Sequence, residues 1–170
     1  VDFLIQMSGS RQHCEIDFFG GEPLLNWEVV KQTVEYIEQE APKYNKIFKL
    51  TLTTNGMLLN QEKIDYVNEH KMSLVLSLDG REDVHNAMRP VAGSGANSYE
   101  YIAKNLVNAV KQRHGLEYYV RGTYTHKNLD FTKDVMAMSD LGFEHLSMEP
   151  VVGEDGDYVL REEDWPALEN

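Results

Sequence analysis

The chain has 170 residues, of which 42% are hydrophobic and 26% are charged, as is typical of a globular domain with a sizeable core. A formal net charge of -12 excludes non-specific binding to nucleic acid or to an anionic membrane, because both need basic patches. No apolar run approaches the roughly 20 residues that span a bilayer, and no signal-peptide pattern is present, so a cytoplasmic protein without membrane contact is expected.

The first strong pattern is an apolar strand that ends in a rigid corner. Ile16, Phe18 and Phe19 form a run that is too short for a helix and suits a buried strand. The sequence Gly-Gly-Glu-Pro follows at residues 20–23, where the glycines permit unusual backbone angles and the proline forces a turn. Such a corner presents backbone carbonyls and one carboxylate, which suit a ligand ammonium group; the alternative is an ordinary turn between a strand and a helix.

Further strands and helices alternate along the rest of the chain. Strands are predicted at residues 16–19, 47–53, 72–78, 116–125 and 144–148, and helices at residues 27–41, after Asn60, from Ser98 to Gly115 and at residues 131–142. The strand at 72–78 is nearly continuous in its apolar residues, which predicts that both of its faces are covered. Residues 81–98, which contain Pro90, Gly93 and Gly95, are expected to be an irregular loop. The alternation predicts a parallel α/β sheet or barrel.

Local motifs offer no disulfide and no metal site. Cys14 is the one cysteine, and it is expected to be incidental or, as the alternative, reactive. The six histidines show neither HxH nor HxxxH spacing.

Polar residues and glycines gather where the predicted strands end. They are residues 20–23, 54–56, 77–80, 123–126 and 149–150. In parallel α/β folds the carboxyl ends of the strands form the rim at which ligands bind. We therefore expect an enzyme or small-molecule site on this rim.

Each candidate residue on the rim has a binding role and a structural alternative. Ser77 and Asp79 suit a ribose diol, or they form a strand-end turn. Arg121 suits a ligand carboxylate, or it forms a structural ion pair.

Two further pairs of residues are weaker candidates. Thr53 and Asn55 either bind ligand or fix their turn. His85 and Arg89 either touch substrate or belong to a packed or solvated loop.

These motifs, in this order, resemble radical S-adenosylmethionine enzymes of the peptide- and protein-maturase type with SPASM architecture. The resemblance rests on Gly-Gly-Glu-Pro-Leu-Leu at residues 20–25, Thr-Asn-Gly at 54–56 and Ser-Leu-Asp-Gly at 77–80 with His85 and Arg89. The stretches at 14–23, 120–125 and 148–151 look most like the SCIFF-peptide maturases, which form thioether cross-links from cysteine sulfur to an α-carbon in a small cysteine-rich precursor peptide. The resemblance covers essentially all of residues 1–170, as one radical SAM core.

The resemblance implies a fold and a set of cofactor contacts. The fold is a partial (β/α)6 barrel, of which the chain would hold the second to sixth strands. Gly20, Gly21 and Glu22 would hold the methionine ammonium, Ser77 and Asp79 the ribose, Arg121 the carboxylate and, loosely, Met148 the adenine.

The chain departs from this family in its cysteines. The CxxxCxxC motif that binds the [4Fe-4S] cluster follows the family's first strand, and neither it nor the cysteine-rich auxiliary domain is present. Residues 1–170 are therefore expected to be an inactive core fragment, truncated at both ends, with the cluster ligands outside it. A sulfatase-type maturase that makes formylglycine is an alternative for the intact enzyme, and a non-catalytic nucleotide- or peptide-binding module is an alternative of another class.

Overall fold

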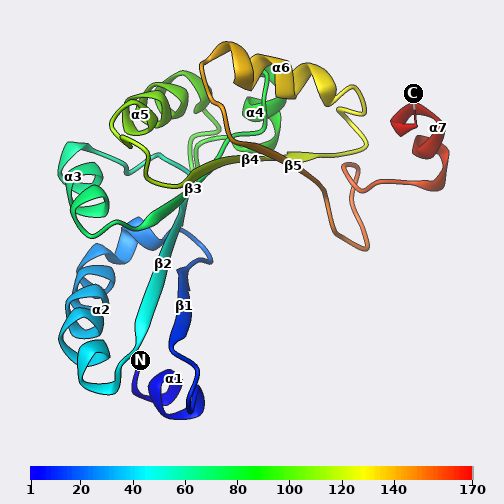
Figure 1. Ribbon diagram of the computed structural model, residues 1–170. Helices are drawn as coiled ribbons and strands as arrows, with labels where there is room; N and C mark the ends of the chain where they lie inside the picture. Colours follow the sequence, from blue (N-terminus) through cyan, green and yellow to red (C-terminus); the bar gives the residue numbers. More distant parts are fainter. Residues whose placement is uncertain (170) are drawn as a thin grey trace.

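The computed structural model describes residues 1–169 and contains one five-stranded parallel sheet (Figure 1). The strands are β1 (His13–Phe18), β2 (Ile47–Thr54), β3 (Ser73–Ser77), β4 (Tyr118–Tyr124) and β5 (Leu146–Pro150). Each strand pairs with the next one along the chain, and all four pairings are parallel. This sequential order is that of an open barrel rather than of a doubly wound sheet, and the parallel α/β prediction is confirmed.

The helices are α1 (Asp2–Met7), α2 (Trp27–Glu40), α3 (Gln61–Glu69), α4 (Glu82–Met88), α5 (Tyr99–Lys111), α6 (Thr132–Asp140) and α7 (Trp165–Leu168), with 3₁₀ turns at Pro23–Asn26, Ala41–Tyr44 and Glu162–Asp164. Helices α2, α3, α5 and α6 cover the convex side of the curved sheet and leave its concave side open, whereas α1 lies beside the amino end of β1 and α7 lies apart from the sheet (Figure 1). None of the helices in residues 1–169 has the length and apolarity that crossing a membrane requires.

Strand alternation divides the sheet into a buried face and an open face. Leu52 on β2 and Leu74 and Leu76 on β3 are buried against the helices. Ser73, Val75 and Ser77 alternate with them and are only half-buried. The prediction that both faces of this strand are covered is wrong for the described chain, because its concave face is open.

The connection between β3 and α5 is more regular than expected. It contains α4, whereas the sequence predicted an irregular loop from Arg81 to Ser98. Asn86 on α4 caps α5, because its side-chain oxygen accepts hydrogen bonds from the backbone N–H groups of Ser98 and Tyr99 at 2.9 and 3.0 Å. These two hydrogen bonds hold α4 against the start of α5.

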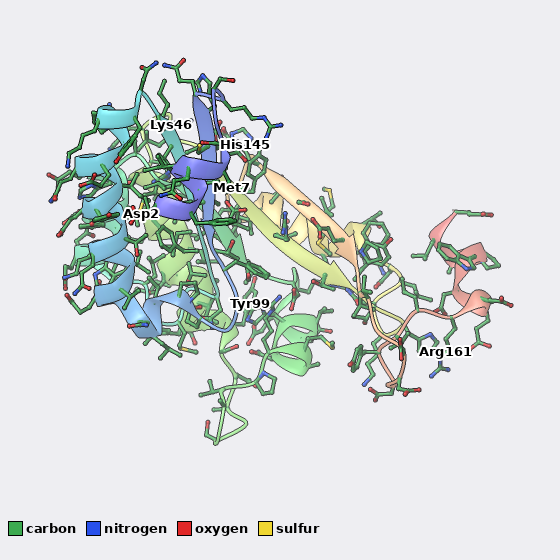
Figure 2. The ribbon with its side chains drawn as sticks, turned by 90° about the horizontal axis from the view of Figure 1, so that it is seen from below. Asp2, Met7, Lys46, Tyr99, His145 and Arg161 are labelled. Atoms are coloured by element: carbon green, nitrogen blue, oxygen red, sulfur yellow. The ribbon has the colours of Figure 1, made fainter. Side chains whose placement is uncertain are left out.

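Both ends of the described chain are tied to the sheet by buried polar side chains. At the start of β2, the Lys46 ammonium donates to the carbonyl oxygens of Gly9 and Arg11, each at 2.7 Å. Near the other end, the buried Asp164 pairs with His126, which follows β4, at 2.8 Å. The segment around Arg161 otherwise lies apart from the sheet (Figure 2).

Candidate functional site

A hollow of about 420 Å³ lies at the carboxyl ends of the strands, on the concave side of the sheet. Its lining comes from the segment after β1 and from the ends of all the other strands: Phe19, Gly20, Gly21, Glu22, Thr53, Thr54, Asn55, Ser77, Arg89, Arg121, Thr123 and Glu149. Its volume lies at the lower end of the range of about 300–1,000 Å³ for small-molecule pockets. The rim predicted from the sequence is therefore one continuous site.

The two glycines after β1 form an open stretch of backbone at the edge of this hollow. Gly20 has a φ of 90° and Gly21 a φ of 54°, which side chains rarely adopt. No heavy atom lies within 4 Å of the place where a Cβ would stand on either residue. The glycines are thus required by backbone angle, and their peptide groups are accessible to a ligand.

Glu22 is held in place by three hydrogen bonds. Its Oε1 accepts from the hydroxyl of Thr54 at 2.8 Å and from the N–H of Leu24 at 3.1 Å. Its Oε2 accepts from the N–H of Asn55 at 2.8 Å. The carboxylate therefore fastens the corner after β1 to the end of β2, and Asn55 takes part in the site through its backbone.

Ser77 and Arg121 lie side by side across two strands. They are Cα partners in the parallel ladder between β3 and β4, so both side chains point to the concave face. Arg121 is half-exposed, and its Nε forms an ion pair with Oε1 of Glu149 at 3.2 Å. Within residues 1–169 the Ser77 hydroxyl and both Nη atoms of Arg121 have no hydrogen-bond partner, which leaves them available to a ligand.

Thr123 and Glu149 also face the hollow. The sequence placed both on the rim, within residues 123–126 and 149–150, but assigned neither a binding role. They are Cα partners in the ladder between β4 and β5. Thr123 lies two residues after Arg121, so strand alternation alone could have identified it. The position of Glu149 at the end of a predicted strand was the corresponding signal.

Asp79 lies beneath the hollow rather than in its lining. The residue is 2% exposed, and its carboxylate accepts hydrogen bonds from Nε and Nη2 of Arg89 and from the N–H of Thr123. Arg89, which follows α4, does reach the hollow. Arg89 is thus the member of this ion pair that lines the hollow.

Two other candidate residues also lie outside the lining. His85 is fully buried, with its Nδ1 accepting from the N–H of Asp79 at 3.3 Å, and burial lowers the pKa of its imidazole to about 4. Met148 is the Cα partner of Gly122, on the face of the sheet that packs against the core. Of the eleven candidates, the hollow brings together all but Asp79, His85 and Met148.

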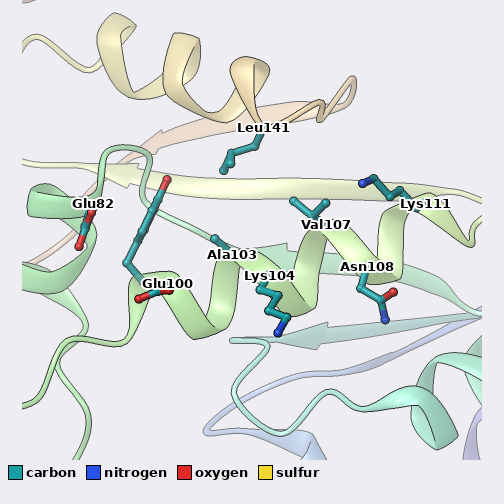
Figure 3. Close-up of a pocket in the computed structure, with 9 residues that line it drawn as sticks. Glu82, Glu100, Ala103, Lys104, Val107, Asn108, Lys111 and Leu141 are labelled. Atoms are coloured by element: carbon teal, nitrogen blue, oxygen red, sulfur yellow. The ribbon is translucent and has the colours of Figure 1, made fainter.

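A larger hollow of about 600 Å³ lies on the opposite side of the sheet, between helices. Ala103 and Val107 on α5 and Leu141 after α6 line its apolar part (Figure 3). It lies away from the strand ends and gathers none of the rim residues.

The residues of the chain do not fit an iron–sulfur cluster. The sequence holds one cysteine, Cys14, which is buried in β1, whereas a [4Fe-4S] cluster takes several thiolate ligands. Among residues 1–169, no group of three or more histidine, cysteine, aspartate or glutamate side chains is arranged to hold a metal ion.

The family of this chain follows from a match to a known family model. The model of the radical SAM superfamily matches residues 10–141, which is most of the chain and includes β1 to β4 with the Gly-Gly-Glu-Pro corner. The chain belongs to the radical SAM superfamily. A radical SAM fragment therefore carries the hollow described above.

Curated relatives of this radical SAM chain include a sulfatase-maturating enzyme and a cyclopropyl synthase. The cysteine-type anaerobic sulfatase-maturating enzyme of Clostridium perfringens strain 13 is 35% identical over 78 residues, which are 45% of this chain and 21% of the relative. The radical SAM cyclopropyl synthase TigE of Paramaledivibacter caminithermalis is 23% identical over 100 residues, 59% of this chain and 20% of the relative. The uncharacterized protein MJ0907 of Methanocaldococcus jannaschii is 23% identical over 134 residues, 79% of this chain and 44% of the relative. The chain spans less than half of the length of each.

Solved structures confirm the partial barrel. The structure titled "Native anSMEcpe with bound AdoMet and Kp18Cys peptide" matches 98% of this chain and 47% of its own chain, with a TM-score of 0.84 at 20% identity. Streptococcus suis SuiB matches 87% of this chain and 31% of its own, with a TM-score of 0.51 at 17% identity. The five strands and their helices are thus a partial radical SAM fold.

Proposed function

We propose that residues 1–170 are the cofactor-binding core of a radical SAM enzyme that modifies a ribosomal peptide. The observation that carries this proposal is the meeting of the open Gly20–Gly21 backbone, Ser77 and Arg121 in one hollow of a radical SAM chain. Solved proteins with the same fold bind AdoMet, and some of them also bind a peptide.

The free groups of the hollow fit the amino-acid and ribose parts of S-adenosylmethionine. Peptide carbonyls at residues 20 and 21 would accept from the methionine ammonium, beside the negative charge of Glu22. Arg121 would donate to the methionine carboxylate, because a guanidinium matches a carboxylate in both charge and geometry. Ser77 would donate to the ribose or to the same carboxylate, and Thr53 and Asn55 would border the ligand.

S-adenosylmethionine, bound beside a reduced cluster that other residues hold, would supply the radical chemistry that removes a hydrogen atom from a substrate. The residues of this chain would bind and orient the cofactor, and the barrel wall would keep water from the reacting atoms. Cluster ligands would have to come from outside these residues, because Cys14 is single and buried.

We propose thioether formation on a small cysteine-rich precursor peptide as the reaction of the intact protein. A cysteine sulfur would bond to an α-carbon, with loss of the thiol proton, of the α-hydrogen atom to the cofactor-derived radical and of one electron to an iron–sulfur cluster. The resemblance of residues 14–23, 120–125 and 148–151 to the SCIFF-peptide maturases supports this reaction. A sulfatase-type maturation, which makes formylglycine, is the second candidate, and the identity with the sulfatase-maturating enzyme over 78 residues supports it. Incubation of the intact enzyme with each peptide class separates the two: a thioether removes an alkylatable thiol without forming a carbonyl, whereas formylglycine reacts with hydrazides.

The test of the proposed function is cofactor cleavage by the intact protein, purified without air and reconstituted with iron and sulfide. After reduction it should convert S-adenosylmethionine to methionine and 5′-deoxyadenosine. A cluster-loaded protein that cleaves no cofactor under reduction would contradict the proposal. Cofactor binding without cleavage would favour a non-catalytic binding module.

A further inference from the structure

Arg89 is held rigidly at the wall of the hollow by a buried partner. Its Nε donates to Oδ2 of Asp79 at 2.6 Å and its Nη2 to Oδ1 at 3.1 Å, so the aspartate forms a bidentate pair with one edge of the planar guanidinium. The Asp79 side chain is 3% exposed and that of Arg89 is 35% exposed. The pair therefore runs from the protein interior to the hollow, with the arginine outermost.

The backbone around this pair is fixed as well. The N–H of Arg89 donates to the carbonyl of His85 at 2.7 Å, and the Ser98 hydroxyl donates to the carbonyl of Arg89 at 2.6 Å. The imidazole of His85 in turn accepts from the N–H of Asp79. Arg89 is thus prepositioned through both its side chain and its main chain.

The outer edge of the guanidinium is free to bind a ligand. A guanidinium carries five N–H donors, and Asp79 takes two of them, which leaves three. Within residues 1–169 those three have no partner.

The two carboxylates that line the hollow already have partners. Glu22 accepts three hydrogen bonds, and Glu149 is paired with Arg121. Apart from the open peptide groups of Gly20 and Gly21, the hollow offers a ligand the unused donors of two guanidinium groups and a hydroxyl. That set favours a ligand with a carboxylate.

We infer that Arg89 binds the carboxylate of the ligand in this hollow, together with Arg121, and that Asp79 is a positioning residue that acts through Arg89. This inference rests on the proposed function, because it takes the ligand to be S-adenosylmethionine, whose one carboxylate would lie between the two arginines. The volume of about 420 Å³ suits one ligand of that size. Asp79 would then have no direct contact with ribose.

The test compares the binding of two probes, S-adenosylmethionine and its decarboxylated form, to the reconstituted intact protein by isothermal titration calorimetry. Arg89→Gln should weaken S-adenosylmethionine binding by about 10- to 100-fold, as for a hydrogen-bonded charge pair, and should leave the affinity for the decarboxylated probe unchanged. Asp79→Asn should weaken S-adenosylmethionine binding in the wild-type background and cause no further loss in the Arg89→Gln background.

Arg81→Gln is the matched control. Arg81 also pairs with a fully buried aspartate, since its Nε donates to Oδ1 of Asp134 at 2.7 Å, but it does not line the hollow. It should lower the thermal stability of the protein without changing either affinity. The double variant Asp79→Asn/Arg89→Gln removes both charges together, so it covers the case in which Arg89→Gln alone leaves Asp79 unpaired and unfolds the protein.

Several outcomes would overturn the inference. An equal loss of affinity for both probes in Arg89→Gln would show that Arg89 does not bind the carboxylate of the ligand. Unchanged binding of S-adenosylmethionine would show that Arg89 does not contact the ligand. An Asp79→Asn loss that persists in the Arg89→Gln background would assign Asp79 a contact of its own. Failure of the wild-type protein to bind S-adenosylmethionine would instead overturn the proposed function and the inference with it.

Discussion

The carboxylate of Glu22 and the hydroxyl of Thr54 meet at 2.8 Å, where the ends of β1 and β2 come together. The same carboxylate accepts from the N–H groups of Leu24 and Asn55. One side chain therefore sets the relative position of the two segments that form one wall of the hollow.

Replacement of Glu22 by alanine should destabilise the protein and weaken its binding of S-adenosylmethionine. Three donors lose their acceptor, and unpaired donors cost about 1–3 kcal/mol when water cannot fully replace the partner. We expect a fall of about that size in the free energy of unfolding, measured with urea. Glu154→Ala, in an exposed loop, should change it by no more than about 0.5 kcal/mol. Equal stability and affinity in Glu22→Ala and wild type would remove Glu22 from this role.

His85 should make the protein less stable as the pH falls from about 6.5 to about 4. Burial is the main cause that lowers the pKa of its imidazole from 6.5 to about 4; the charge of Arg89 adds to this effect and that of Asp79 opposes it. Between pH 6.5 and about 4, His85 is protonated in the unfolded chain but stays neutral in the folded chain. The free energy of unfolding therefore falls by roughly 3 kcal/mol across this window.

Urea unfolding at several pH values measures this dependence, with His85→Gln as the non-titrating control. The variant should show a shallower fall of the unfolding free energy between pH 6.5 and pH 4. The same slope in both proteins would mean that His85 titrates alike in the folded and unfolded states.

Gly80→Ala should be far more destabilising than Gly93→Ala, although both glycines have a positive φ, of 100° and 82°. A Cβ on Gly80 would stand 2.1 Å from Cβ of Asp134 and 2.6 Å from its Cα, whereas no heavy atom lies within 4 Å of the same position on Gly93. Both variants carry the backbone cost of about 1–2 kcal/mol, and only Gly80→Ala adds an overlap with backbone, for a total above roughly 3 kcal/mol. Midpoints of urea unfolding that shift by the same amount would argue against this close approach of α6 to the end of β3.

Much of the site could be predicted from the sequence because parallel strands bring their carboxyl ends together. The apolar runs that contain Ser77 and Arg121 predict two strands, and their parallel pairing places the two residues side by side. The corner at residues 20–23 was predicted from its glycines and proline alone.

The parts that the sequence did not predict depend on contacts between segments. Helix α4 has only seven residues and buries a histidine, His85, so its sequence is too short and too polar for a clear helical hydrophobic pattern. Asp79 was expected to face a ligand or to form a strand-end turn, but it is buried and paired with Arg89, ten residues further along the chain. Met148 lies on the core side of β5, a placement that changes with a shift of one residue in the strand register.

The most direct test of the central claim is the equilibrium dissociation constant of S-adenosylmethionine for the reconstituted intact protein and for Arg121→Gln, measured by anaerobic equilibrium dialysis. Lys127→Gln serves as the control, because Lys127 forms an exposed ion pair with Asp157 and does not line the hollow. We predict binding to the wild type and to Lys127→Gln with equal affinity, and binding to Arg121→Gln weaker by about 10-fold or more. A wild-type protein that binds no S-adenosylmethionine, or an Arg121→Gln variant that binds it as tightly as the wild type, would contradict the placement of the cofactor in this hollow.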